Sequence, residues 1–333
     1  MTHEKRVRLK LLATPAVLIV VVASALCFGH YPIKLPVLME AFFSSASVSN
    51  EVKVVLWDIR FPRIMAAILC GAALSVAGAA YQGMFKNPLV SPDILGVSSG
   101  AGLGASLAIF LNSSMLVVQL YAFAGGLATV GIVCFVSRFA RYHSPVLSMV
   151  LSGIAVGALV SAGVSLFKIL SDPYTQLMSI TFWLMGGLNS IVAQDLYSVA
   201  PVVVLGLLPL FLLRWRMNLL SLDDEEAQAL GVNVRWTRLI FIVCATLITA
   251  SVVSISGIIG WVGLVVPHIA RLWIGPDFSK LLPAALFIGA AFLVLTDLVA
   301  RTIAPIEIPL GIITAFVGAP FFIALLIQGG ERK

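Results

Sequence analysis

Long apolar segments recur along the whole chain and alternate with short polar connections. Ten of these segments approach the roughly 20 apolar residues that a helix needs to cross the hydrocarbon core of a bilayer. We therefore predict an all-α integral membrane protein with about ten transmembrane helices, built as a single domain over residues 1–333. The predicted spans are Leu11–Phe28, Ile64–Phe85, Val97–Leu111, Leu116–Val136, Val146–Leu170, Val192–Leu213, Leu239–Ile255, Ile258–Ile274, Leu281–Ala300 and Leu310–Ile327.

The distribution of Lys and Arg sets the predicted orientation, because cytoplasmic connections carry the excess of both residue types. With the N-terminus inside, 15 of the 21 Lys and Arg residues lie on the cytoplasmic side and 6 lie outside. The further apolar segment Thr175–Leu188 is short, and counting it as an eleventh span would spoil this bias. We predict a short outer or re-entrant helix there, an outer loop at His30–Pro62, and both termini in the cytoplasm.

The stretch Ser221–Asn233 holds the only acidic run in the chain and lies between two predicted spans on the cytoplasmic side. It is typical of a short helix, because Ser221 can cap its start and four acids suit the positive end of a helix dipole. Gly231 is placed to end the helix in a left-handed conformation. We predict a handle for a soluble partner. Its acids are Asp223, Asp224, Glu225 and Glu226, and its apolar side is Leu222, Ala229 and Leu230.

The composition excludes several classes of protein. Charged residues make up 11% of the chain, whereas soluble domains carry roughly 25%. The net charge of +6 is scattered between spans, with no basic stripe and no interleaved aromatics, so nucleic acid is not an expected partner. The four cysteines lie in apolar segments without metal-ligand spacing, which favours burial over metal binding.

Ionisable groups are nearly absent from the predicted spans. Asp297 is the only acid well within one, and Arg301 follows at the spacing of a helical ion pair. Without a relay of acids and histidines, an ion-coupled secondary transporter is poorly supported, although it remains the rival from another class. The chain also lacks the phosphate-binding loop of an ATPase. We therefore expect no enzyme activity and an external energy source.

Small residues mark where helices approach closely in a membrane. Gly96, Gly100 and Gly104 recur four apart in the third span, which favours tight packing. The fifth span carries hydroxyls as well, so packing and the lining of a pathway both remain open for it. Its small residues form one stripe of Gly153, Gly157, Ser161 and Ser165 and another of Ser148 and Ser152.

Nine short stretches, in order from end to end of the chain, make it resemble the permease subunit of ABC importers for iron-siderophores, haem and vitamin B12. One such stretch would be weak evidence, whereas the ordered set is specific. The stretches are Arg60–Arg63, Gly71–Leu74, Asn87–Val97, Phe182–Gly187, Ala229–Val232, Gly263–Arg271, Asp297–Arg301, Ile308–Gly311 and Gly318–Pro320.

The resemblance implies the fold and partners of a type II importer in an inner or cytoplasmic membrane. Two copies of a ten-span subunit would form a homodimer, with two cytoplasmic ATPase subunits below it and a periplasmic binding protein above it. ATP and Mg would be held by the ATPases, and this chain would hold no cofactor or metal. The expected cargo is a metal chelate, with an iron-siderophore preferred and haem, vitamin B12, molybdate or tungstate as alternatives.

The resemblance also assigns roles to residues. The coupling helix of the family falls on Leu222–Val232, which includes Ala227. Arginines that meet a binding protein fall on Arg60, Arg63 and Arg301, and snorkelling at the membrane surface is the alternative for Arg60 and Arg63. The pathway would follow the dimer axis along span five, and its inner gate would be the loop before that span. The pathway and gate residues are Ser144, Val146, Leu147, Ser148, Ser152, Gly157, Ser161 and Ser165, and Val146 and Leu147 depart from the small hydroxyl residues that the vitamin B12 permease has at its gate.

Overall fold

The computed structural model is helical in the ranges that it describes, residues 3–43, 48–139 and 145–330. Within these ranges, seven helical runs are long and apolar enough to cross a membrane, in agreement with the predicted all-α membrane fold. The seven runs contain α1 (His3–Cys27), α4 (Phe61–Met84), α6 (Met115–Phe139), α7 (Pro145–Leu170), α9 (Ala193–Leu212), α12 (Val234–Ser256) and α14 (Phe278–Ala300).

The other three predicted spans also form apolar helices: α5 (Val97–Phe110) and α13 (Val262–Ile274) are short, with 14 and 13 residues, and α15 (Leu310–Gly330) has 21. With 13 residues, α13 is only about 20 Å long, less than the thickness of a hydrocarbon core. The non-helical residues 257–261 precede it, and Ile259 among them is 5% exposed. Such backbone is tolerated at membrane depth when the protein itself surrounds it.

The segment Thr175–Leu188 forms α8 (Gln176–Met185), a 10-residue helix of about 15 Å that is too short to span. The prediction of a short helix here is confirmed. Gln176 at its start donates to the carbonyl oxygen of Phe110 over 2.9 Å. At the other end, the Leu310 amide donates to the Gly186 carbonyl oxygen over 2.9 Å. Both ends of α8 are therefore fixed to neighbouring elements.

The outer connection His30–Pro62 is not the loop that we predicted from its polar residues. It contains α2 (Leu35–Phe43), α3 (Asn50–Lys53) and η1 (Val54–Arg60), whose backbone widens to a π-helix. The last two continue into α4 as one helical run of 35 residues, about 52 Å long. The prediction gave weight to the charged residues and overlooked a helical pattern of apolar ones. Val52 and Leu56 are four apart, and both are buried.

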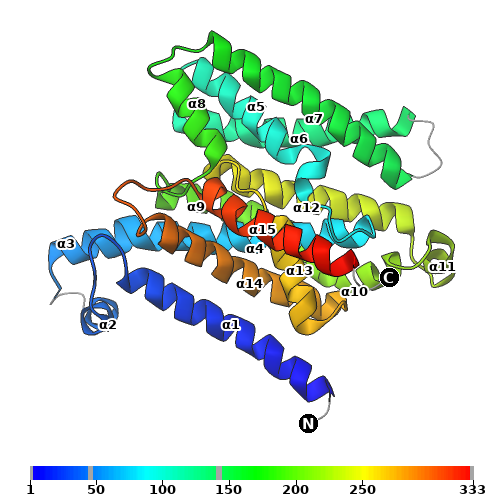
Figure 1. Ribbon diagram of the computed structural model, residues 1–333, viewed down its shortest axis with the longest axis horizontal. Coiled ribbons are helices and arrows are strands. Elements are labelled where there is room, and N and C mark those ends of the chain that lie inside the picture. Colours follow the sequence, from blue (N-terminus) through cyan, green and yellow to red (C-terminus); the bar gives the residue numbers. More distant parts are fainter. Residues whose placement is uncertain (1–2, 44–47, 140–144, 331–333) are drawn as a thin grey trace.

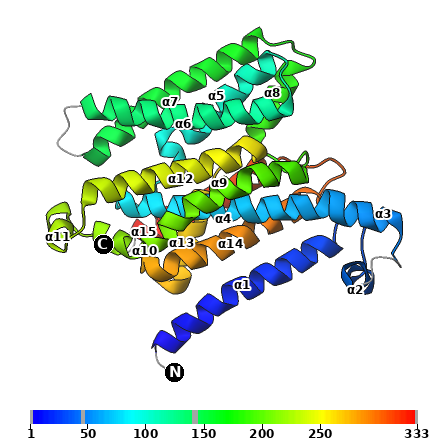
Figure 2. The same cartoon turned by 180° about the vertical axis from the view of Figure 1, so that it is seen from behind.

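The helices form stacked layers, and α4 lies near the middle (Figure 1). On one side α4 packs against α14, and α1 packs against α14 at the edge of the molecule. On the other side α4 packs against α12, which also contacts α9 and α6, and α5, α6 and α7 complete that side. Figure 2 shows the same order from behind. Both ends of the described chain lie at the same end of the bundle as α11 (Asp224–Ala229), as the predicted orientation requires (Figure 1).

Glycines let α4 approach two neighbours at backbone distance. A Cβ on Gly71 would lie 2.2 Å from the carbonyl oxygen of Gly289 on α14, and one on Gly78 would lie 1.9 Å from that of Gly263 on α13. In lipid, where apolar side chains gain nothing from meeting one another, such close contacts are a main source of helix association. Ser75 adds a buried hydrogen bond from its hydroxyl to the Ala285 carbonyl oxygen, 2.7 Å long.

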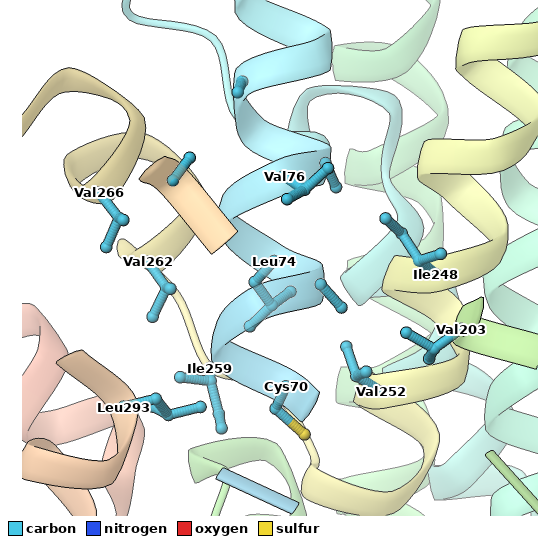
Figure 3. Close-up of a cluster of buried hydrophobic side chains, with 14 of the residues drawn as sticks. Cys70, Leu74, Val76, Val203, Ile248, Val252, Ile259, Val262, Val266 and Leu293 are labelled. Carbon is cyan, nitrogen blue, oxygen red and sulfur yellow. The ribbon is translucent and has the colours of Figure 1, made fainter. Parts of the chain in front are cut away.

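Apolar side chains from several helices surround α4 (Figure 3). All of those labelled in the figure are buried, and they join α4 to α9, α12, α13 and α14 in one continuous core. The labelled residues are Cys70, Leu74, Val76, Val203, Ile248, Val252, Ile259, Val262, Val266 and Leu293.

The glycine stripe of the third span has the packing role that its pattern favours. A Cβ on Gly100 would lie 2.5 Å from the Gly125 carbonyl oxygen on α6, and one on Gly104 would lie 2.0 Å from that of Tyr121. Gly96 differs from the other two, since it precedes α5 with a positive φ of 76°. Gly96 therefore allows the left-handed turn before α5, and Gly100 and Gly104 allow the close contact with α6.

Replacing Gly78 by Ala is expected to lower the free energy of unfolding by about 1–3 kcal/mol, because the added Cβ overpacks a backbone contact. Gly131→Ala on α6 is the matched control, since a Cβ there would meet no heavy atom within 4 Å. Thermal unfolding of both variants in one detergent measures the difference. Equal midpoints would contradict the close contact between α4 and α13.

Candidate functional site

The acidic stretch folds as a short cytoplasmic helix, α11, between α10 (Arg214–Leu220) and α12. The residue that precedes α11 is Asp223, with extended backbone at φ −67° and ψ 153°. Ser221 is not the cap that we predicted, because it ends α10, and its hydroxyl donates to the Met217 carbonyl oxygen over 3.2 Å. Asp224 and the two glutamates after it occupy the first turn, where the helix dipole favours negative charge.

The end of α11 matches the prediction for Gly231, which has a φ of +84°. Its amide donates to the Gln228 carbonyl oxygen over 2.9 Å, and the Val232 amide donates to that of Ala227 over 3.1 Å. These two hydrogen bonds form a Schellman motif, which satisfies carbonyl groups that the helix end leaves open. A Cβ on Gly231 would meet no heavy atom within 4 Å, so the backbone conformation alone demands glycine here.

Two cations attach this segment to the membrane helices. The guanidinium of Arg238, in the second turn of α12, donates two hydrogen bonds of 2.7 and 2.8 Å to the carboxylate of Asp224. These bonds hold the pKa of Asp224 below its usual value. The Lys86 ammonium, just past the end of α4, lies 3.5 Å from the Asp223 carboxylate and donates to the Leu222 carbonyl oxygen. A displacement of α11 would therefore pull on α4 and α12 together.

The segment presents a mixed apolar and acidic surface to the cytoplasm. Ala227 and Val232 are buried and anchor it from within. Leu222 and Leu230, which the sequence assigned to the apolar side, are 38% and 60% exposed. Ala229 is exposed beside them, as are both glutamates of the first turn. The exposed leucines and acids together are suited to contact with another protein.

One face of the first half of α7 packs inward. Ser148 and Ser152 are 3% and 6% exposed, so in this chain they do not face an open space. A Cβ on Gly153 would lie 2.1 Å from the Ile94 carbonyl oxygen in the short helix η2 (Pro92–Leu95). These positions therefore pack against neighbouring elements of the same chain.

The second half of α7 carries the small residues that do face outward. Ser161 and Ser165 are exposed, and a Cβ on Gly157 would meet no heavy atom within 4 Å. The Ser165 hydroxyl donates to the Ser161 carbonyl oxygen over 3.1 Å, so its donor is satisfied within the helix. This part of α7 forms a smooth surface that a second copy or a moving solute could contact.

The predicted inner gate lies partly outside the described residues. Ser144 falls in the undescribed range 140–144, and the described helix starts at Pro145. Val146 is half-buried and Leu147 is 46% exposed. The described part of the gate therefore presents apolar side chains.

At the outer ends of α4 and α14, five charged side chains form a cluster that includes all three predicted docking arginines. Arg63 donates to the Asp297 carboxylate over 2.8 Å and to both oxygens of Glu307 over 2.9 Å. The predicted pair of Asp297 with Arg301 is present, with 3.5 Å between Nε and Oδ2. With Arg60 included, the cluster holds three guanidinium groups and two carboxylates, which leaves one positive charge in excess.

The three arginines point into the protein, which rules out snorkelling as the role of Arg60 and Arg63. Arg60, Arg63 and Arg301 are 4%, 8% and 6% exposed. Arg60 donates to the carbonyl oxygens of Leu26 and Tyr31, and Arg301 donates to that of Ala25. Two of the arginines thereby fasten the end of α1, and Arg63 binds the segment before α15.

Glu307 was missed in the sequence, although it stands directly before the Ile308–Gly311 stretch that carries the family resemblance. Its carboxylate and Arg63 both line an outer cavity of about 570 Å³. Polar side chains also line it, from α8 and from the loops after α5 and after α8. Those from the two loops and α8 are Asn112, Ser113, Thr175, Gln176, Ser179, Asn189 and Ser190.

Comparisons with known proteins agree with this architecture. A model of the FecCD transport family matches residues 17–328. A Helicobacter pylori protein named as an iron chelatin transport system permease is 42% identical over 279 residues, which cover 84% of each chain. A molybdate import system permease of Haemophilus influenzae is 37% identical over 323 residues, 95% of each chain.

One solved structure extends the agreement to three dimensions. It is described as an inward-facing conformation of a metal-chelate type ABC transporter, and it superposes with a TM-score of 0.87 at 36% identity. The match covers 96% of this chain and 98% of that chain. The resemblance drawn from the sequence motifs is confirmed, and the alternative of a secondary transporter gains no support. The chain belongs to the FecCD transport family and is a multi-pass membrane permease of an ABC transporter.

Proposed function

We propose that two copies of this chain form the pathway of an importer for a metal chelate, an iron-siderophore before other cargoes. Two cytoplasmic ATPase subunits drive the pathway, and a periplasmic binding protein delivers the cargo. The observation that carries the proposal is the attachment of α11 to α4 and α12, the two most buried of the long helices. A partner that moves α11 thereby acts on the core of the permease.

The coupling role follows from how α11 is held. Its inner side is fixed by buried Ala227 and by the Asp224–Arg238 pair, whereas its exposed leucines and glutamates face the cytoplasm. ATP closes the ATPase pair, which shifts α11, and α12 passes the shift to α5 and α6, which pack against α7. Nucleotide and Mg are held by the ATPases, so this chain performs no hydrolysis.

The pathway is proposed to run between two copies along the second half of α7. Gly157, Ser161 and Ser165 offer a surface with small side chains and hydroxyls, which suits a bulky solute that must bind weakly and leave. An apolar groove of about 650 Å³ runs along α15, where Phe316 is 79% exposed. A second copy would cover such a surface. Val146 and Leu147 would close the inner end by excluding water.

The cargo assignment rests on chemistry and on relatives. The exposed half of α7 offers no metal ligands, which favours a cargo whose metal is already enclosed by a chelator. The Helicobacter pylori relative is named for an iron chelate, and the Haemophilus influenzae relative for molybdate, at similar identities. Haem, vitamin B12 and oxyanions therefore remain the alternatives within one mechanism.

Docking of the binding protein is proposed to use the outer arginine cluster. Its excess positive charge would attract acidic groups and set their register. Arg63 is the member that borders the outer cavity, while Arg60 and Arg301 are occupied by backbone carbonyls. A carboxylate of the binding protein would therefore reach Arg63 by taking the place of Glu307.

The proposed function is tested by uptake into vesicles. Reconstituted permease, ATPase and binding protein should accumulate a radiolabelled ferric siderophore when ATP is supplied. Omitting any one of the three should abolish accumulation. Accumulation by the permease alone under an ion gradient would overturn the proposal, and accumulation of molybdate, haem or vitamin B12 instead of the siderophore would correct the cargo only.

Gly231→Arg is expected to uncouple ATP hydrolysis from uptake. A left-handed backbone costs a non-glycine residue about 1–2 kcal/mol, and the new side chain would project into the ATPase contact. Uptake should fall by about tenfold or more for such a loss, with ATPase activity retained. Gly231→Asn is the control, because Asn tolerates this conformation and adds no charge. Normal uptake by Gly231→Arg would remove the coupling role.

Arg63→Gln and Glu307→Gln are expected to change docking in opposite directions. The first removes the excess positive charge of the cluster and should weaken binding of the binding protein, while the second frees Arg63 and should strengthen it. Both effects should be larger at 0.01 M salt, where the Debye length is about 30 Å, than at 0.1 M, where it is about 10 Å.

Lys34→Gln removes an exposed outer charge and serves as the control for docking. Surface plasmon resonance over a salt titration gives the affinities, and thermal midpoints show whether each variant keeps its fold. Equal affinities for folded Arg63→Gln and Lys34→Gln at every salt concentration would refute the assignment.

A further inference from the structure

A second apolar groove lies on the opposite side of the molecule from α7 and has no role in the proposed pathway. This α1 groove has a volume of about 290 Å³ and runs between α1, α13 and α14. Val17, Trp273 and Leu295 on its walls are 55%, 46% and 48% exposed, so it opens to the surroundings of the bundle. Its lining residues are Ala13, Thr14, Val17, Val21, Ile269, Trp273, Ile288, Ala291, Phe292 and Leu295.

The two polar groups of the groove are satisfied within the protein. The Thr14 hydroxyl donates to the Leu11 carbonyl oxygen over 2.8 Å, and the Trp273 indole donates to that of Lys10 over 3.3 Å. An occupant of the groove would therefore make apolar contacts, and no polar group of the groove needs a hydrogen bond from it. Such a surface suits an acyl chain.

Basic side chains lie beyond the cytoplasmic end of the groove. Arg6, Lys10, Thr14, Val17 and Val21 follow one another at spacings of four, four, three and four, so they lie on one face of α1. Lys10 lies 5.2 Å from the centre of the Trp273 ring and donates to the Trp273 carbonyl oxygen over 2.9 Å. An ammonium has three donors, so Lys10 retains donors for a further acceptor. Arg6 is exposed one turn below.

The length of this stripe matches one leaflet. From Lys10 to Val21 α1 rises about 16 Å, and half of a hydrocarbon core is about 15 Å thick. A molecule with its charge at Lys10 and its apolar part along the groove would end near the midplane of the bilayer. A phospholipid of the cytoplasmic leaflet has this shape, and the basic end selects a negatively charged headgroup.

We propose that the α1 groove binds an anionic phospholipid of the cytoplasmic leaflet. One acyl chain lies between α1 and α14, and the phosphate accepts hydrogen bonds from Lys10 and Arg6. The bound lipid covers part of the surface of α1 beside the rest of the bundle, because the protein itself buries little of α1. The site is independent of cargo, ATPase and binding protein.

The test uses purified permease in nanodiscs that contain a trace of spin-labelled phosphatidylglycerol or spin-labelled phosphatidylcholine. The immobilised fraction should be greater for phosphatidylglycerol. A basic residue near the surface contributes about 1 kcal/mol to the attraction of anionic lipid, which is about a fivefold change in binding. Lys10→Gln should reduce the preference by about fivefold and the double variant Arg6→Gln, Lys10→Gln by about 25-fold.

Three further variants distinguish lipid binding in the groove from attraction to the basic surface as a whole. Lys10→Arg should retain the preference, since it keeps the charge. Ala13→Trp should remove the immobilised lipid by filling the groove without changing any charge. Lys280→Gln removes a cytoplasmic charge outside the groove, where Lys280 pairs with Asp277 at 3.4 Å, and should leave the preference unchanged.

Several results would overturn the proposal. Equal immobilisation of the two lipids by the unmodified chain would do so, as would an unchanged preference in folded Lys10→Gln. An equal loss in Lys280→Gln would assign the preference to general surface charge. A change of oligomeric state in Ala13→Trp, measured by light scattering, without loss of bound lipid would identify the groove as a contact between protein chains instead.

Discussion

The close backbone contact of α4 with α13 and α14 is the interaction on which the rest of the structure depends. Gly71 meets Gly289 of α14 and Gly78 meets Gly263 of α13, so α4 approaches both helices at backbone distance. Water does not drive apolar helices together inside a bilayer, and tight packing of this kind takes its place. Because α4 is fixed along its length, its two ends have defined positions, and both candidate functional regions are built on them.

At the cytoplasmic end Lys86 meets Asp223, just before α11, and at the outer end Arg63 meets Asp297 and Glu307. Lys86 and Arg63 thus lie at the two ends of α4, which is buried and otherwise uncharged. Electrostatic attraction acts strongly at the buried outer cluster, where little solvent screens it, and more weakly at the exposed cytoplasmic pair. Helix α4 therefore connects the surface proposed for the binding protein with the surface proposed for the ATPase.

The layer that contains α7 has a different character. The most apolar stretch of α7 is 17% buried, against 83% for the run that contains α4. A helix held on one side only can shift with little loss of contact, whereas a helix packed all round cannot. The contrast suits the proposed mechanism, in which α4 and α12 carry the motion of α11 and the exposed half of α7 is the surface that the cargo meets. At the other edge α1 is also little buried, and the lipid proposed for the α1 groove would contact α1 there.

Relations within one helix could be predicted from the sequence, because helix geometry alone sets them. The length of the apolar segments determined the membrane spans, the four-residue spacing determined the Asp297–Arg301 pair, and Gly231 determined the end of α11. Relations between helices could not be predicted, because they depend on which surfaces pack together. Only the tertiary structure placed Arg63 beside Glu307, 244 residues away, and divided the small residues of α7 into a buried and an exposed set.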